Sequence, residues 1–207
     1  MIESDSPVTL TLLFANIAIF FWVRYSNPKY FALFAEWPYQ IVHYKRYYQM
    51  LTSAFLHADF GHLFFNMFAL FTFGQVLEKF FVINFGQAIG SLYFFLIYSI
   101  SLFSGSILPL FFHFRNPKYV AVGASGAVSG IVFSYILFFP TSTIGFFFIP
   151  MPAFVFAFLY VALSIYGMKS RLGNIGHESH LGGAIGGVIA TLLIVEGALA
   201  YFLSHFK

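Results

Sequence analysis

The chain has no cysteine and few charged residues, since Asp, Glu, Lys and Arg make up only 8% of its 207 residues. The absence of cysteine excludes disulfides, thiolate metal sites and a thiol nucleophile, and with them a cysteine protease. Soluble domains carry about 25% charged residues, so the low share of charge argues against a soluble protein. The formal net charge of +3 comes from scattered Lys and Arg, a pattern that gives no support to nucleic-acid binding.

Long apolar runs make up most of the sequence. Hydrophobic residues are 60% of the chain and the mean hydropathy is +0.84, which indicates a multi-pass integral membrane protein embedded in a lipid bilayer. About 20 apolar residues span a bilayer. Six stretches approach that length, at residues 8–23, 61–77, 85–110, 122–139, 144–168 and 179–203. We therefore expect an all-α membrane protein with one six-transmembrane-helix domain over residues 1–207.

The longest connection between these stretches covers residues 24–60 and is rich in aromatic residues. It carries Trp37, Lys45, Arg46 and several Tyr. This amphipathic mixture suits the membrane interface. An ordinary connecting loop is the alternative interpretation.

Two apolar stretches carry glycines beside a polar side chain that could take part in catalysis. Ser125 stands in Gly123-Ala124-Ser125-Gly126, and His180 precedes Gly183 and Gly187. Glycines spaced by three and four residues share one helix face and let two helices approach closely. A serine and a histidine on such facing helices can act as nucleophile and general base. Simple helix packing is the alternative for Ser125, although a histidine without a partner is costly at membrane depth.

A second group of polar residues lies at the start of the second stretch. His62 and Asn66 are four residues apart and share a helix face, and His57 lies one to two turns earlier. Both His62 and Asn66 can donate hydrogen bonds, so with the backbone N–H of Ser125 they could stabilise an oxyanion. A structural hydrogen-bonding role is the alternative for these two residues.

The acidic residues stand near the termini, in the loops or at the ends of stretches, so none is placed to orient His180. A hydrolase built on these residues would use a Ser-His dyad without a carboxylate. Histidines could also bind a metal, but His177-Glu178-Ser179-His180 lacks the H-E-x-x-H spacing of helical zinc hydrolases. We expect neither a metal nor another cofactor.

Taken together, these motifs resemble those of the rhomboid family of intramembrane serine proteases, in its bacterial six-span form. The family's G-x-S-G pattern reads Gly123-Ala124-Ser125-Gly126 here. Its H-x-x-x-x-H-x-x-x-N pattern is matched by His57, His62 and Asn66, and its A-H-x-x-G-x-x-x-G pattern by Ser179-His180, Gly183 and Gly187. The resemblance covers nearly the whole chain, with the motifs in order on the second, fourth and sixth stretches.

The resemblance implies a role for each matched residue. Ser125 would be the nucleophile, His180 the general base, and His62, Asn66 and the Ser125 amide the oxyanion donors. Glu78 would match a family acid that anchors the end of the second span. Residues 24–60 would form the family's half-submerged first loop, and the phenylalanine-rich fifth span its lateral gate. The residues expected to support the site are Gly123, Ala124, His57, Glu78, Gly126, Gly183 and Gly187.

Three features depart from the family pattern. A Trp-Arg pair ahead of the second span is replaced by Tyr48-Gln49, which raises the question of how the first loop is pinned. Position 129 often carries an aromatic residue that stacks on the catalytic histidine, but it is Ser129 here, so another side chain must orient His180. Ser179 replaces the alanine that precedes this histidine in many members.

The function implied is cleavage of transmembrane segments of membrane proteins. The alternative is a catalytically silent rhomboid-like protein that binds transmembrane helices. The substrate and the oligomeric state stay open. Eight of the ten Lys and Arg lie in the loops on the expected active-site side, so the positive-inside rule would turn that side to the cytoplasm. The resemblance implies a bacterial inner membrane protein with catalysis toward the outside, and we follow it because Arg24, Lys45 and Arg46 could bind lipid phosphates.

Overall fold

The computed structural model of this chain describes residues 6–146, 149–170 and 176–207, which are mostly helical. The first half contains α1 (Pro7–Tyr25), α2 (Lys29–Phe34), α3 (Pro38–Tyr44), α4 (Tyr48–Thr52), the 3₁₀ turn η1 (Ser53–Phe55), α5 (Phe60–Ala69), the π-helical turn η2 (Leu70–Gly74), α6 (Gln75–Phe85) and α7 (Gln87–His113). The second half contains α8 (Ser125–Phe138), β1 (Thr143–Phe146), β2 (Ile149–Pro152), α9 (Ala153–Ser170), α10 (His177–Ile194) and α11 (Ala198–Ser204).

Four helices in the described part of the chain are long and apolar enough to cross a membrane: Pro7–Tyr25, Phe60–Phe85, Gln87–His113 and Ala153–Ser170. A fifth span results if α10 and α11 are taken as one, although they meet at 106°. The second span is continuous through α5, η2 and α6. These findings confirm a mostly helical multi-pass membrane protein with four or five candidate spans. The shorter apolar helix Ser125–Phe138 falls in another of the expected stretches, and six spans stay a prediction.

Local backbone features explain why the helices differ from three of the predicted apolar stretches. At residues 122–139, helix α8 begins only at Ser125 because Gly123 has a φ of +126°, outside the helical region. At residues 144–168, Pro150 and Pro152 fall in an antiparallel hairpin of β1 and β2, so the chain is not all-α and α9 starts at Ala153. At residues 179–203, the helix breaks before Gly197, whose φ is +77°.

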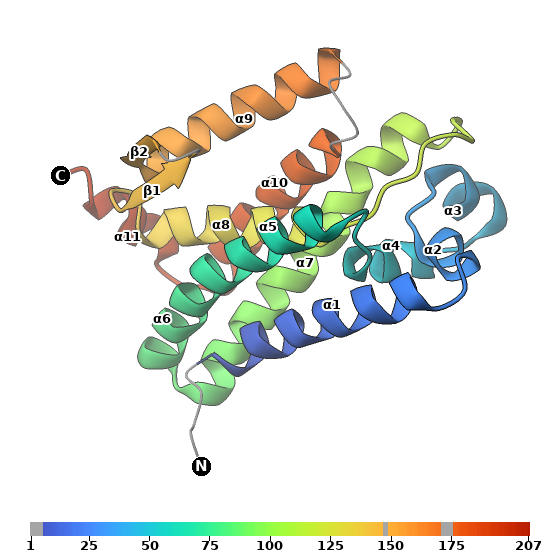
Figure 1. Cartoon of the computed structure of the whole chain (residues 1–207). Coiled ribbons are helices and arrows are strands. Elements are labelled where there is room, and N and C mark those ends of the chain that lie inside the picture. The colour runs from blue at the N-terminus through green and yellow to red at the C-terminus, as the bar shows by residue number, and fades with distance from the viewer. Residues whose placement is uncertain (1–5, 147–148, 171–175) are drawn as a thin grey trace.

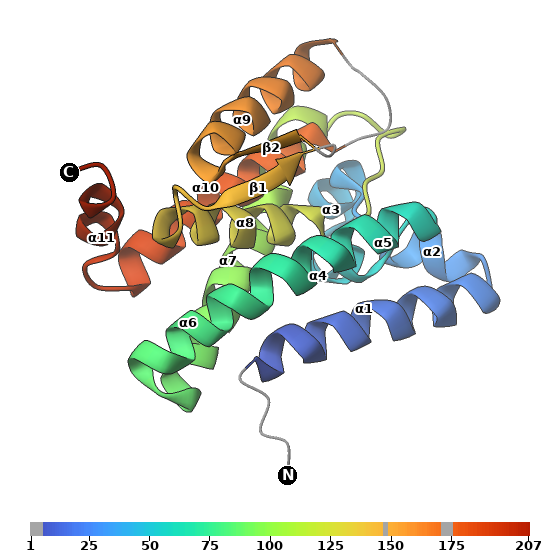
Figure 2. The same cartoon turned by 60° about the vertical axis from the view of Figure 1, so that its left-hand side comes forward.

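Helix α8 occupies the interior of the molecule. Figures 1 and 2 show α8 between α7, α10 and the α5–α6 helix, with α1 and α9 at opposite edges of the bundle. From Gly126 to Phe138 every residue of α8 except Tyr135 is buried. A short helix enclosed in this way is held by packing against its neighbours, and lipid has little access to it.

Glycines let α8 and α10 touch backbone to backbone. A Cβ added at Gly183 would lie 1.9 Å from the carbonyl oxygen of Gly126, and one added at Gly187 would lie 2.4 Å from the Cα of Gly130. Real side chains do not tolerate such distances, so glycine is required on both helices. The close approach expected from the glycine spacing is therefore present.

Glu78 joins three segments at the end of the bundle that holds the start of α1. Its buried carboxylate accepts hydrogen bonds from the backbone N–H groups of Val8 and Thr9, at 3.0 and 2.8 Å, and from the Thr9 hydroxyl at 2.8 Å. It also accepts one from Ser91 on α7 at 2.8 Å. These contacts fit the anchoring role that the resemblance implies for Glu78.

The connection between α1 and α5 is fixed to the rest of the fold by polar contacts. Glu36 pairs through its backbone with Ala121, and each N–H donates to the other's carbonyl at 2.9 Å. Gln49, which stands where the family has part of its Trp-Arg pair, donates to the carbonyl of Leu33 at 3.0 Å. Trp37 Nε1 donates to the carbonyl of Pro117 at 3.1 Å. This connection therefore holds the segment that leads into Ser125.

Candidate active site

Ser125 is the first residue of α8 and follows a bend at Gly123. The Gly123 N–H donates to the carbonyl of Ser53 at 3.0 Å, and Ala124 is fully buried. A Cβ at Gly123 would lie 2.6 Å from His62 Cε1, 2.8 Å from His62 Nε2 and 3.7 Å from Ser125 Oγ. The His62 ring and the Ser125 hydroxyl therefore face the same side of Gly123, and only glycine leaves room for both.

The first N–H groups of a helix have no partner within that helix. At the start of α8 they belong to Ser125 and its successors, and the helix dipole adds partial positive charge at this end. This arrangement favours negative charge beside the Ser125 hydroxyl.

Ser125 and His180 flank the point where α8 and α10 touch. A Cβ at Gly126 would lie 3.2 Å from the carbonyl oxygen of Ser179, the residue before His180. Both Ser125 and His180 are half-buried. In the described part of the chain no hydrogen bond joins Ser125 Oγ to the His180 ring. Catalytic hydrogen bonds are often long without substrate and tighten in the complex.

His62 is held in a defined orientation by its own turn of helix. Asp59 caps α5 by accepting a hydrogen bond from the His62 backbone N–H at 2.8 Å. The backbone N–H of Ala58 donates to His62 Nδ1 at 3.4 Å. If Nδ1 accepts, the proton of the neutral ring sits on Nε2, the nitrogen that faces Gly123. His62 thus presents a donor toward the region beside Ser125.

Asn66 and His57 surround His62. The buried Asn66 amide donates to the carbonyl of His62 at 2.9 Å, so one of its two donor hydrogens is engaged there. The His57 ring meets the His62 ring edge to face, with centroids 5.1 Å apart. Burial, and then the proximity of His62, lower the pKa of His57 to about 4, so His57 is neutral at physiological pH. Its position is that of a packing neighbour of His62.

The surroundings of His180 are aromatic. Tyr160 on α9 stacks on the His180 ring, with centroids 6.1 Å apart and planes 29° apart. His177 meets the ring edge on at 6.4 Å. Glu178 pairs with His113 at 3.4 Å, away from His180. Tyr160 is thus an aromatic side chain that stacks on His180, as expected of an aromatic residue at position 129 in the family pattern.

Sequence reasoning missed two residues near the site, Tyr160 and Asp59. Asp59 could have been found, because an Asp three residues before His62 and just ahead of an apolar run is typical of a helix N-cap. Tyr160 could not, because it is one of 13 tyrosines and its contact with His180 depends on how α9 packs against α10.

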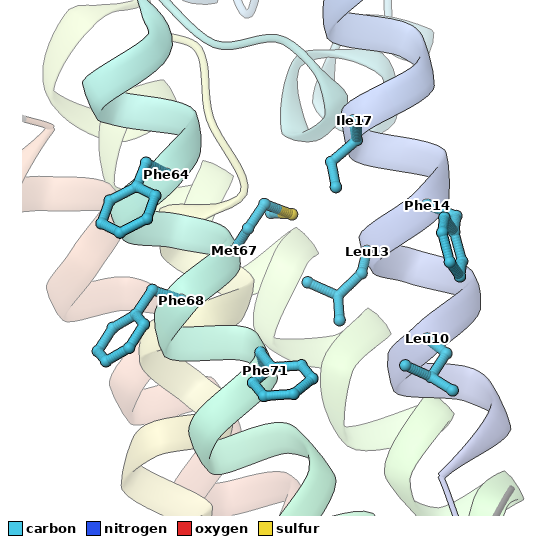
Figure 3. Close-up of a pocket in the computed structure, with 8 residues that line it drawn as sticks. All are labelled: Leu10, Leu13, Phe14, Ile17, Phe64, Met67, Phe68 and Phe71. Carbon is cyan, nitrogen blue, oxygen red and sulfur yellow. The ribbon is translucent and has the colours of Figure 1, made fainter.

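An apolar groove of about 350 Å³ lies apart from these residues, between α1 and α5. Figure 3 shows side chains from the two helices facing each other across it. Its lining is Leu10, Leu13, Phe14, Ile17, Phe64, Met67, Phe68 and Phe71. The groove carries no group that could take part in acid–base or nucleophilic chemistry, and its composition is that of a surface in contact with lipid.

The sequence of this chain is similar to those of known proteins. The rhomboid domain family matches residues 44–197. RHOMBOID-like protein 12, mitochondrial, of Arabidopsis thaliana is 30% identical over 212 residues, which cover 96% of this chain and 61% of that protein. Putative rhomboid protease YdcA of Bacillus subtilis is 31% identical over 153 residues, covering 72% of this chain and 68% of that protein. Rhomboid protease GluP of the same organism is 28% identical over 188 residues, covering 88% of this chain and 34% of that protein.

This chain therefore spans 61% of the length of the Arabidopsis relative and only a third of GluP, at 34%. The family match covers more than half of the chain and contains Ser125, His180, His62 and Asn66. By this family match and by its similarity to these relatives, the chain belongs to the rhomboid family.

Proposed function

We propose that this chain is an intramembrane serine endopeptidase that cleaves transmembrane segments of membrane proteins with a Ser125–His180 dyad. The observation that carries the proposal is the position of the Ser125 hydroxyl. It stands at the N-terminus of α8, on the same side of Gly123 as His62 Nε2, and at the contact with the helix that bears His180.

In the proposed mechanism His180 removes the proton from Ser125 Oγ as the oxygen attacks the carbonyl carbon of the scissile peptide bond. The carbonyl oxygen becomes an oxyanion and accepts hydrogen bonds from the Ser125 N–H, His62 Nε2–H and the free amide hydrogen of Asn66. The intermediate collapses, the C–N bond breaks, and His180 returns the proton to the departing amine. Water then attacks the acyl carbon while His180 removes a proton from it. The second intermediate collapses, the bond to Ser125 Oγ breaks, and His180 returns the proton to that oxygen.

An intact helix hides its peptide carbonyls in hydrogen bonds, so a substrate must unwind at the cut. We expect substrates with Gly or Pro near the cut to be cleaved faster than matched substrates with Ala and Leu there. The assay is cleavage of a single-pass substrate in proteoliposomes. Equal rates for the two substrates would contradict local unwinding as a requirement.

The decisive test of the dyad is labelling of the detergent-solubilised protein by a fluorophosphonate, which reacts with activated serines. Ser125→Ala and His180→Ala should both abolish labelling. Ser204→Ala is the matched control, because Ser204 is exposed on α11 and its hydroxyl donates to the carbonyl of Tyr201 in the same helix. A folded wild type that is not labelled would favour a catalytically silent protein that binds transmembrane helices. Labelling that survives Ser125→Ala would assign the nucleophile to another serine.

The proposed setting is a bacterial inner membrane, with the active site toward the outside. The curated relatives come from bacteria, mitochondria and chloroplasts. Protease protection of a tag at each end of the chain, in sealed vesicles of known orientation, tests this assignment. Exposure of the active-site loops on the cytoplasmic face would instead favour the orientation that the Lys and Arg distribution predicts.

A further inference from the structure

Tyr160 touches both helices of the candidate dyad although it belongs to neither. Its ring stacks on the imidazole of His180 in α10. Its hydroxyl shares a short hydrogen bond with Ser129 Oγ in α8. Ser129 Oγ also donates to the backbone carbonyl of Ser125 at 2.7 Å. A single side chain of α9 therefore connects the imidazole of His180 to the turn that carries Ser125.

His180 needs such a contact because no acid holds its ring. Among the described residues, no hydrogen bond or ion pair joins a carboxylate to His180, and Glu178 pairs with His113 instead. A half-buried imidazole with freedom about its side-chain torsions would sample several orientations. A flat aromatic ring over one face restricts that freedom, and Tyr160 supplies such a ring beside His180.

Helix α9 is the least enclosed of the candidate spans. Only 17% of its apolar window is buried, against 44% for α7. Its contact with α10 runs through the stack of Tyr160 on His180 and through Gly167, where an added Cβ would lie 2.3 Å from His177 Nε2. Figure 1 shows α9 at the edge of the bundle beside α10. A helix with so little buried surface can shift more easily than α7 or α8, and Tyr160 would move with it.

We propose that Tyr160 is a positioning residue that orients His180 for Ser125, and that it makes the readiness of the dyad depend on the position of α9. This inference rests on the proposed protease function. With α9 packed against α8 and α10, His180 is held for proton transfer. When α9 moves away, the stack opens and the imidazole is released.

The test compares variants that remove the ring with variants that remove only the hydroxyl bond. Tyr160→Ala should lower kcat on the order of 10²-fold, the cost of a misplaced catalytic group, and leave KM nearly unchanged. Tyr160→Phe and Ser129→Ala each keep the stack and remove the hydrogen bond between these two residues, and Ser129→Ala also removes the bond to the Ser125 carbonyl. Tyr160→Phe should lower kcat by less than about 10-fold, and adding it to Ser129→Ala should cause no further loss, because the bond that it removes is already absent.

Rescue distinguishes positioning from a general loss of structure. Adding Ser129→Tyr to Tyr160→Ala puts a ring one helical turn after Ser125, in the space left by Tyr160. This double variant should recover a large part of kcat. Tyr166→Ala is the matched control, because Tyr166 lies on the same helix and is 62% exposed. If Tyr160→Ala does not fold, Tyr160→Leu keeps the apolar volume without a flat ring and should show the same loss of kcat.

Labelling by the fluorophosphonate separates failure of this inference from failure of the proposed function, because the reagent needs no substrate helix. Slow labelling of Tyr160→Ala with normal labelling of Tyr166→Ala supports the positioning role. A wild type that labels and cleaves, together with a Tyr160→Ala variant that labels at the same rate, overturns the role of Tyr160 and leaves the protease intact. A folded wild type that neither labels nor cleaves overturns both.

Discussion

Glu36 should make the stability of this protein fall as the pH rises through neutrality. Its side chain is 5% exposed, and the Ser106 hydroxyl donates to it at 3.2 Å. Burial raises the pKa of Glu36 from 4.5 to about 8, and the hydrogen bond from Ser106 opposes that shift only in part. Tyr119, whose own pKa is raised by burial and by Glu178 and Glu36, is neutral near it. The folded state therefore holds a neutral Glu36 at physiological pH.

The direction of this pH dependence follows from the protons that the folded and unfolded states bind. Between about 4.5 and 8 the folded state binds a proton on Glu36 that the unfolded chain has lost, so the free energy of unfolding decreases as pH rises across this window. Each pH unit inside the window costs about 1.4 kcal/mol. From about pH 6.5 to about pH 8 the loss is roughly 1–2 kcal/mol, because Glu36 is half protonated in the folded state at the upper end of this range.

His57 works in the opposite direction. Its pKa in the folded state is lowered from 6.5 to about 4, so folding gains stability as pH rises through that range. Above about pH 6.5 this gain is nearly complete, and it adds only a few tenths of a kcal/mol. The contribution of His57 cancels when wild type is compared with Glu36→Gln, because both proteins carry His57.

The assay is equilibrium unfolding in mixed micelles at a series of pH values. The difference in free energy of unfolding between wild type and Glu36→Gln should change by roughly 1–2 kcal/mol between about pH 6.5 and about pH 8, in favour of the variant at the higher pH. Glu196→Gln, at an exposed position on the turn after α10, is the matched control and should follow the wild type. Parallel curves for wild type and Glu36→Gln would refute the reasoning, since Glu36 would then be ionised in the folded state.

Three further substitutions have expected outcomes. Gly183→Ala places a Cβ 1.9 Å from the carbonyl oxygen of Gly126 and should prevent the contact of α8 with α10. The result should be loss of fluorophosphonate labelling and of the unfolding transition. Gly145→Ala is the control and should leave both intact, because a Cβ there has nothing within 4 Å. A stable, fully labelled Gly183→Ala protein would show that the helices are not in contact there. In Glu78→Gln the donors of Thr9 face an amide that itself donates, so the free energy of unfolding should fall by about 2–4 kcal/mol. A change no larger than that of Glu196→Gln would argue against an anchoring role for Glu78. Asp59→Ala removes the cap of α5 and should lower the free energy of unfolding by about 1 kcal/mol. Asp59→Asn keeps a capping oxygen and should retain most of the stability. Equal losses for the two variants would mean that the capping hydrogen bond contributes little.

Hydropathy alone located most of the long helices. The stretches at residues 8–23, 61–77 and 85–110 lie within the spans Pro7–Tyr25, Phe60–Phe85 and Gln87–His113, apart from the first residues of the third, because long apolar runs in lipid must form helices. Hydropathy failed where a backbone feature interrupts an apolar run. Gly123 and Gly197 adopt positive φ values, which an apolar average cannot reveal.

The candidate site was predictable to the extent that it depends on local spacing. The glycines on α8 and α10 indicated a close approach, and that approach brings Ser125 and His180 to either side of one contact. The residues that sequence reasoning missed or left without a role depend on tertiary packing. Tyr160 reaches His180 only through the position of α9, and Glu36 is buried only because its segment pairs with Ala121. No periodicity in the sequence encodes either contact.

The length of α8 sets the depth of the proposed chemistry. Its 14 residues make a helix of about 21 Å, whereas the hydrocarbon core of a bilayer is about 30 Å thick. If the far end of α8 is level with one edge of that core, Ser125 lies roughly 9 Å below the other edge. A substrate carbonyl must descend by about two turns of helix to reach it, so the point of attack is fixed by depth in the membrane before any side chain of the substrate is recognised. In unrelated substrates the cut would then fall at the same distance from the membrane surface, and helix-weakening residues near that position would decide how fast each substrate is cleaved.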